Sequence, residues 1–192
     1  LIPEHLSAEA IHNISNIPEL RIDFQGSDIP NHSFLLSAVE QTQESFCYVV
    51  TETCFWERKK HLTEKIFKPI VAKRPFILVG ATANLKYLKS YGFKTFDRWI
   101  DESYDDETDP VKRIDMIVSE LKKLCNLSMH ELNRLYEEMK DILDYNFNHF
   151  YNGNFKSIIV DELVDNFAHS IHQWNHARLT DNKVDISDLN LD

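Results

Sequence analysis

The chain has 192 residues, of which 43% are hydrophobic and 27% are charged. Its 31 acidic and 21 basic side chains give a formal net charge of −10 at pH 7, which argues against a protein that coats nucleic acid. The apolar share excludes wholesale disorder and predicts one sizeable core, and the low counts of glycine (4) and proline (6) favour helices over turn-rich sandwiches and barrels.

The first 45 residues contain three short predicted elements. Ser7 can cap a short helix, Leu20–Phe24 alternates apolar and polar residues as a strand does, and a helix is expected from Asn31 to about Gln43. The chain begins with Leu1 and not with Met, so we expect it to be a fragment or a processed product. Residues 1–45 are therefore interpreted as a remnant of a missing domain or a linker to it.

A β–α–β unit is predicted next. The run Phe46–Thr51 is β-branched and aromatic, which predicts a strand buried on both faces of a parallel sheet. Thr63 precedes an amphipathic helix that should end near Lys73. Pro75–Gly80 then predicts a second buried strand with proline at its first position. A strand, a helix and a strand within about 35 residues indicate parallel pairing.

The α/β pattern is expected to continue after this unit. Thr82 is predicted to cap a helix that runs through Tyr91 and ends at Gly92. Phe93–Phe96 is predicted to form a third short strand. The segment Asp101–Asp109 has six acidic residues in nine and is predicted to be a solvated loop.

The rest of the chain predicts helices. Asp109-Pro110 is a helix start with proline at the first helical position, and Ser128 with Glu131 forms a capping box for a helix toward Phe150. A further helix is expected from about Lys156 to Arg178, followed by an acidic, weakly ordered tail. Together the elements predict an α/β fold: a Rossmann-like parallel sheet with helices, followed by an all-helical C-terminal extension.

Ligand chemistry is expected where the parallel strands end, because ligands of open α/β sheets bind beyond the carboxyl ends of the strands. Between Glu57 and Arg74 seven basic and two acidic residues give a local net charge of +5. A phosphate group at the start of the following helix would explain this reversal of sign, and a solvated helix face is the alternative. Arg58 and Lys68 are candidate phosphate contacts by charge, and Gly80 and Thr82 are candidate ligand contacts by their place at the exit of the second strand.

Two runs of residues carry a resemblance to a known family. The run His61-Leu-Thr-Glu-Lys-Ile-Phe-Lys-Pro-Ile70, followed by Arg74-Pro-Phe-Ile-Leu-Val-Gly80, resembles the Thr-Glu-Lys signature of glycosyltransferases related to the α-1,3-fucosyltransferases. The later run Gly92–Asp105 is similar to that of phage and virus proteins labelled as glycosyltransferases. The resemblance covers about residues 46–150.

The resemblance implies a GT-B glycosyltransferase with two Rossmann-like domains, of which residues 46–150 are the nucleotide-sugar-binding one. Glu64 would accept hydrogen bonds from the ribose hydroxyls of the donor, and Lys65 would pair with its diphosphate. A nucleoside diphosphate sugar is then the substrate and no metal or other cofactor is expected. The family's upstream Asn-Ser pair is replaced here by Thr53-Cys-Phe-Trp56. The base and the sugar are therefore not specified.

Length sets a second expectation about function. Two such domains need roughly 300 residues, so this chain should lack the acceptor domain and the general base it usually carries. No catalytic residue is assigned, and the acceptor and oligomeric state are left open. The alternative is a non-catalytic interaction or assembly module that retains the fold and uses its helical C-terminal half to hold a partner.

Other sequence features predict no further chemistry. The three cysteines are an odd number without a zinc-type pair and suggest neither a disulfide framework nor a metal knuckle, which favours a reducing, cytoplasmic compartment. The resemblance to virus proteins implies the host cytoplasm if the protein is virus-encoded. We expect no membrane span and no nucleic-acid partner. His169, His172 and His176 share one helix face; they can bind zinc or belong to a polar surface, and we favour the surface. Trp56, Trp99 and Trp174 are interpreted as core residues or pocket walls.

Overall fold

The computed structural model describes residues 8, 12–13, 15–16, 39–56 and 59–180, and the side chains of 39–40 and 176–180 are not described. The chain divides into two units, Leu1–Ser37 and Ala38–Asp192. The predicted strand Leu20–Phe24, the start of the helix expected from Asn31 and the acidic tail lie outside the described residues. The described end of that predicted helix is α2, Val39–Glu44.

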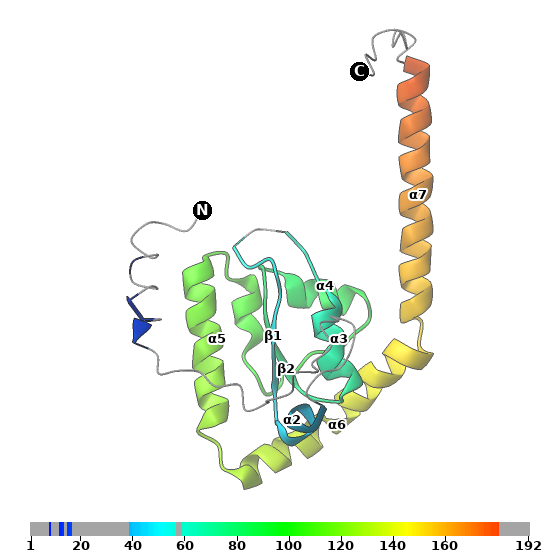
Figure 1. The fold of residues 1–192 in the computed structure, drawn as a ribbon. Helices are drawn as coiled ribbons and strands as arrows, with labels where there is room; N and C mark the ends of the chain where they lie inside the picture. Colours follow the sequence, from blue (N-terminus) through cyan, green and yellow to red (C-terminus); the bar gives the residue numbers. More distant parts are fainter. Residues whose placement is uncertain (1–7, 9–11, 14, 17–38, 57–58, 181–192) are drawn as a thin grey trace, which may run out of the picture. The chain divides into compact units, whose positions relative to one another are not determined.

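The second unit is built on a small parallel sheet (Figure 1). Strand β1, Tyr48–Thr51, and strand β2, Phe76–Val79, pair in parallel with Tyr48 opposite Phe76 and Thr51 opposite Val79. Helix α3, Glu64–Val71, connects them. The predicted β–α–β unit is confirmed, and helices make up most of the described residues.

The two strands differ in burial. In β2 the side chains of Phe76, Ile77 and Leu78 are all buried, as predicted. In β1 only Val50 is buried, and Val49 is 40% exposed. The prediction that β1 is buried on both faces is wrong, because among the described residues only one strand pairs with it and only one face meets the core.

Helix α4, Asn84–Ser90, follows β2 and ends as predicted, with Gly92 just beyond it at a φ of +89° that favours glycine. The predicted strand Phe93–Phe96 does not form. Phe93 and Phe96 are buried, but side chains take the hydrogen bonds of this segment. Asn146 accepts from the Lys94 N–H (2.9 Å) and donates to the Lys94 carbonyl (2.8 Å), and Glu102 accepts from the Phe96 N–H (2.7 Å).

The acidic segment 101–109 is more ordered than a solvated loop. It contains a 3₁₀ helix, η1, Glu102–Asp106, in which Tyr104 and Asp105 are buried. Its backbone approaches α4: the Ala83 N–H donates to the Asp105 carbonyl at 2.7 Å. The prediction of a solvated loop is wrong, because part of the segment is helical and its Tyr104 and Asp105 side chains are buried.

Helices α5, Pro110–Cys125, and α6, Met129–Asn152, begin at the predicted caps. The Asp109 carboxylate accepts from the N–H groups of the first turn of α5, at 2.9 and 3.3 Å. At α6 the Ser128 hydroxyl accepts from the Glu131 N–H while the Glu131 carboxylate accepts from the Ser128 N–H, which confirms the capping box. Both helices contribute to the core through Ile117, Met139 and Leu143.

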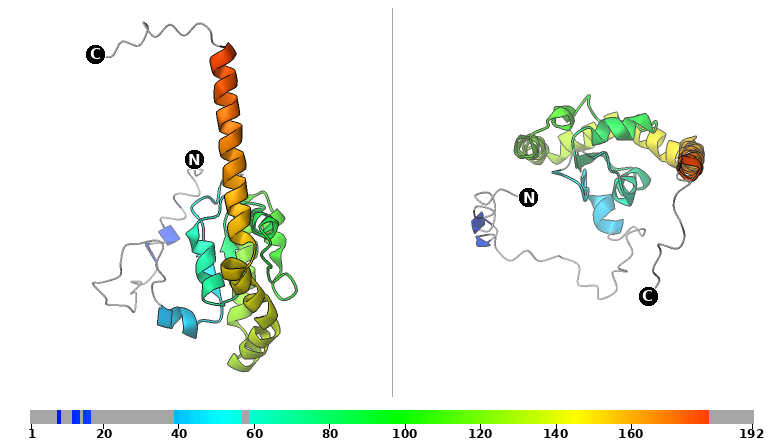
Figure 2. Two further views of the ribbon diagram at one scale, coloured as in Figure 1. Left: turned by 90° about the vertical axis from the view of Figure 1, so that its right-hand side faces the viewer. Right: turned by 90° about the horizontal axis from the view of Figure 1, so that it is seen from above.

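Helix α7, Phe155–Thr180, follows α6 after a short break (Figure 2). Its first residue, Phe155, lies in an aromatic cluster with Phe67, Phe93 and Phe150, with ring centroids 4.9 to 5.8 Å apart. Beyond Ile158 the described side chains of α7 are exposed. Trp174 is 59% exposed and Trp56 51% exposed, so neither is a core residue, whereas Trp99 packs on the core.

No described helix combines the length and the apolar composition that crossing a bilayer requires.

Candidate functional site

Glu64 and Lys65 occupy the first turn of α3, just beyond the carboxyl end of β1. Thr63 is the N-cap, with its hydroxyl oxygen 3.4 Å from the Lys65 backbone N and 3.1 Å from Lys65 Nζ. Lys65 Nζ also lies 3.9 Å from Glu64 Oε1, and the two side chains are 36% and 28% exposed. The two predicted ligand-binding side chains therefore lie beside each other, both partly exposed, in the first turn of α3.

Glu52, which the sequence reasoning missed, holds this turn in place. It follows β1 directly, its backbone N–H donates to the Val79 carbonyl at 2.9 Å, and its side chain is buried. One carboxylate oxygen accepts from the Thr63 N–H (3.1 Å) and the other from the Thr63 hydroxyl (2.7 Å). The start of α3 is thereby tied to the end of the sheet. An acidic residue directly after a buried strand was the available signal.

Gly80 and Asn84 fix the segment that leads into α3. The Asn84 side chain is fully buried, accepts from the His61 N–H (3.2 Å) and donates to the His61 carbonyl (3.1 Å). A Cβ at position 80 would lie 2.7 Å from Asn84 Nδ2. Gly80, predicted as a ligand contact, thus has a packing role: it leaves room for the amide that holds His61.

Thr82 does not cap α4. The N-cap is Ala83, in the left-handed conformation (φ 63°), and the Thr82 hydroxyl donates to the Asp105 carbonyl at 2.9 Å. The Asp105 carboxylate instead accepts from the Leu85 N–H (2.9 Å) and the Lys86 N–H (3.0 Å). Burial raises the pKa of Asp105 above its ordinary value, against the effect of these two hydrogen bonds. An internal acid therefore occupies the start of α4.

Arg113 is a second residue that the sequence reasoning missed. It lies on α5, four residues before the buried Ile117, and is itself buried. Its guanidinium donates to the carbonyls of Gly80 (3.1 Å), Glu107 (2.8 Å) and Phe55, and lies 4.5 Å from the Phe55 ring centroid. Burial lowers the pKa of this guanidinium. Arg113 thus joins the segments that follow β1, β2 and η1.

The remaining predicted phosphate contacts are placed differently. Lys68 lies in the last turn of α3, three residues after Lys65 and so on the same side of the helix. Arg58 lies outside the described residues. Lys59 and Lys60 are exposed in the segment before α3, and Lys60 Nζ lies 5.9 Å from the Tyr87 ring centroid. Lys59 and Lys60 therefore lie before α3, and Lys68 lies in its last turn. Among these lysines Lys65 is the one in the first turn.

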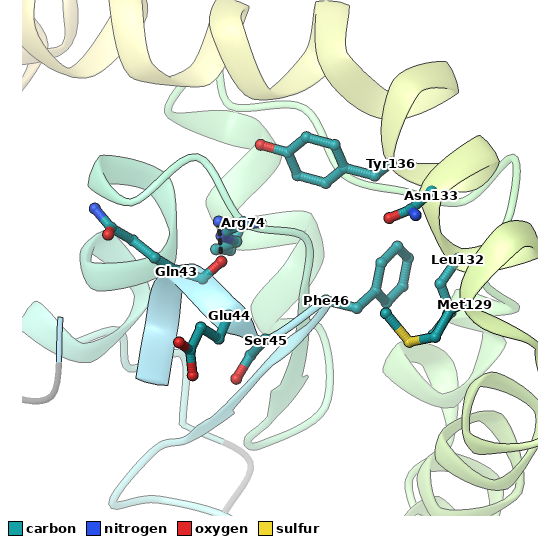
Figure 3. A pocket seen from close by; sticks show the side chains of 9 residues that line it. All are labelled: Gln43, Glu44, Ser45, Phe46, Arg74, Met129, Leu132, Asn133 and Tyr136. Carbon is teal, nitrogen blue, oxygen red and sulfur yellow. Dashed lines mark hydrogen bonds between the residues drawn. The ribbon is translucent and has the colours of Figure 1, made fainter. Parts of the chain in front are cut away.

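Two described cavities lie near Phe46, which precedes β1, away from the carboxyl ends of the strands. One has a volume of about 240 Å³ and is shown in Figure 3, with Phe46 and Leu132 at its apolar side and Arg74 opposite. Arg74 donates to the Gln43 carbonyl, and its guanidinium lies 5.2 Å from the Tyr136 ring centroid. The other cavity, of about 260 Å³, shares Phe46 and Leu132. Neither includes a predicted ligand contact.

Metal ligands are not grouped in the described part of the chain: it holds no cluster of three His, Cys, Asp or Glu side chains suited to a metal ion. His169 and His172 are exposed on α7, and His169 Nε2 lies 2.8 Å from Gln173 Nε2. The chemistry available at the carboxyl edge of the sheet is therefore that of the first turn of α3.

Comparison with protein-family models, curated proteins and solved structures found no match.

Proposed function

We propose that the chain is the donor-binding part of a glycosyltransferase and binds a nucleoside diphosphate sugar at the first turn of α3. In this proposal β1, α3 and β2 belong to a Rossmann-like domain, and α7 is a C-terminal helical extension of it. The observation that carries the proposal is the pairing of Glu64 and Lys65, both partly exposed, at the start of a helix that connects two parallel strands.

The two side chains suit the two halves of such a ligand. A carboxylate accepts hydrogen bonds from two vicinal hydroxyls, as Glu64 would from a ribose. The Lys65 ammonium and the positive end of the α3 dipole favour a diphosphate at the same place. Lys65 Nζ is already held within 3.1 Å of the Thr63 hydroxyl, which reduces the entropy lost when the ammonium meets a phosphate.

The same chemistry suits the transfer reaction. When the bond between the sugar and the diphosphate breaks, negative charge develops on the diphosphate oxygen that leaves. The Lys65 ammonium would stabilise that charge without a proton transfer. The acceptor and the general base would be supplied by another domain, and none of the described residues is assigned the role of base.

The start of α4 offers no equivalent site. Two N–H groups of its first turn, those of Leu85 and Lys86, donate to the Asp105 carboxylate. A phosphate there would have to displace the Asp105 carboxylate from these N–H groups, whereas at α3 the buried carboxylate of Glu52 binds the N-cap residue Thr63. This supports the choice of α3 over α4, and it removes Thr82 and Gly80 from the proposed set of ligand contacts.

A thermal-shift screen tests the proposal. The full chain is melted with GDP, UDP, ADP, CMP and their sugar conjugates, with inorganic pyrophosphate as a probe of the phosphate contacts alone. A ligand at about 100 times its Kd stabilises the native state by about 2.7 kcal/mol, which raises the Tm by several degrees. We expect one nucleoside diphosphate to raise the Tm selectively.

The variant Lys65→Ala should lose this shift while its own Tm without ligand stays close to that of the wild type, because Lys65 is partly exposed. Lys122→Ala, which removes an exposed lysine on α5, is the matched control and should keep the shift. Equal shifts in wild type and Lys65→Ala, or no shift with any nucleotide, would contradict the proposal.

A further inference from the structure

Helix α7 presents a row of large apolar side chains to solvent. The row consists of Val160, Val164, Phe167, Ile171 and Trp174, which are between 47% and 61% exposed. We call these five residues the α7 seam. Large apolar patches on a protein surface mark interaction sites, whereas single exposed apolar residues are ordinary. The exposure of this row marks α7 as a candidate interaction surface.

The base of α7 is fixed to the core, and the seam faces away from that contact. The Tyr91 hydroxyl donates to Glu162 Oε2 at 2.8 Å. Glu162 follows Val160 by two residues, which places it about 200° around a helix of 3.6 residues per turn. The side of α7 that contacts Tyr91 is thus roughly opposite the seam, and the seam is left accessible to another molecule.

The spacing of the seam is that of a two-stranded coiled coil. Its residues follow one another at intervals of four, three, four and three, a repeat of 3.5 residues. This assigns Val164 and Ile171 to heptad position a, and it assigns Val160, Phe167 and Trp174 to position d. Position a thus holds β-branched residues, as in parallel two-stranded coils, whereas position d holds valine and two aromatic residues in place of the leucine that such coils favour.

The charges beside the seam fit a second copy of the same helix. In a parallel, in-register pair each g residue faces the e residue five positions later on the other helix. Lys156 occupies g and Asp161 occupies e, and both are exposed, so Lys156 would face Asp161 of the second copy. The next such pairs, Leu163 with Ala168 and Ser170 with Asn175, contain no charge.

An antiparallel pair lacks this ion pair. If two copies overlapped antiparallel along the whole seam, Lys156 of one copy and Asp161 of the other would lie near opposite ends of the overlap. The pair of opposite charges therefore favours the parallel orientation.

We propose that the chain forms a parallel, in-register homodimer through the α7 seam. His169 and His172 then lie on the outer side of the coil, in heptad positions f and b. The seam includes no residue of the first turn of α3, so the dimer and the donor site can be tested independently of each other.

Sedimentation velocity on the full chain tests the dimer. The wild type should sediment with twice the mass of one chain. Phe167→Asp combined with Ile171→Asp should weaken association roughly hundredfold or more, because two large side chains leave the interface. Asn166→Asp combined with His172→Asp, which adds the same charge at positions c and b, should leave the dimer intact. A monomeric wild type, or a seam variant that still dimerises, overturns the proposal.

A charge swap tests the orientation. Lys156→Glu and Asp161→Lys, each alone, place like charges across the parallel interface and should raise the dimer Kd about two- to fivefold. The double variant restores opposite charges and should return the Kd to the wild-type value. Far-UV circular dichroism checks that each variant remains helical. Single variants without effect, or a double variant that shows no recovery, overturn the parallel in-register arrangement.

Discussion

Glu52 and Thr63 are joined by two hydrogen bonds that connect the end of β1 to the start of α3, with the Thr63 N–H and hydroxyl donating to separate oxygens of one buried carboxylate. The pair sets where α3 begins and hence where Glu64 and Lys65 lie. The bidentate geometry needs a group that only accepts hydrogen bonds.

Glu52→Gln is therefore expected to lower the free energy of unfolding by about 1–3 kcal/mol, because the amide would present a donor to the Thr63 hydroxyl oxygen, which already accepts from the Lys65 backbone N–H and from Lys65 Nζ. Urea denaturation measures the change. Glu44→Gln, at an exposed position at the end of α2, should stay within about 0.5 kcal/mol of the wild type. A Glu52→Gln variant as stable as the Glu44→Gln control would show that the link contributes little.

Asp105 caps α4 from a distance of about twenty residues along the chain. Asp105→Ala should destabilise the protein by about 1–2 kcal/mol, because the N–H groups of Leu85 and Lys86 lose their acceptor. The neighbouring Asp106 is exposed and forms a surface ion pair with Lys86. Its replacement by alanine should cost well under about 1 kcal/mol. The two variants are compared by thermal and urea unfolding, and equal losses would argue against the capping role.

Glu102 gives a pH dependence of defined sign. Burial raises the pKa of Glu102 above its ordinary value, so the folded state binds the proton more tightly than the unfolded state. Its contribution to stability therefore increases as the pH falls through the folded pKa, and it levels off below the unfolded value of about 4.3. Relative to Glu102→Gln, which cannot ionise, the wild type should gain stability as the pH is lowered across this range. A constant or opposite difference would contradict this assignment.

The cysteines should differ in reactivity. Burial raises the pKa of the Cys47 thiol to about 12, so almost none of it is thiolate near neutral pH. Cys125 is exposed at the end of α5. Brief treatment of the native protein with iodoacetamide, followed by mass spectrometry, should find Cys125 modified well before Cys47. The difference should disappear in denaturant, and comparable rates in the native protein would contradict the burial of Cys47.

Local signals predicted the elements whose causes are local. The capping box of Ser128 and Glu131, the Asp109-Pro110 start of α5 and the glycine after α4 each depend on residues within a few positions, and all were found. The β–α–β unit was predicted from two apolar runs of strand length separated by one amphipathic helix.

The false strand and the missed site residues share one cause: side chains from other segments supply the hydrogen bonds. Phe93–Phe96 has the composition of a strand, but its hydrogen bonds go to Glu102 and to Asn146, which is some fifty residues away. The roles of Glu52, Asn84 and Arg113 likewise depend on contacts between segments that only the fold brings together. Buried polar residues such as these lie outside what hydrophobic periodicity can predict.

Isothermal titration calorimetry with a ribonucleoside diphosphate and its 2′-deoxy counterpart tests the donor site most directly. If Glu64 accepts from the ribose hydroxyls, the wild type should bind the ribose form about tenfold more tightly. Glu64→Ala should remove that preference, and Lys65→Ala should weaken both ligands at least about tenfold. A wild type that binds neither ligand, or a ribose preference that survives in Glu64→Ala, would contradict the proposed donor site.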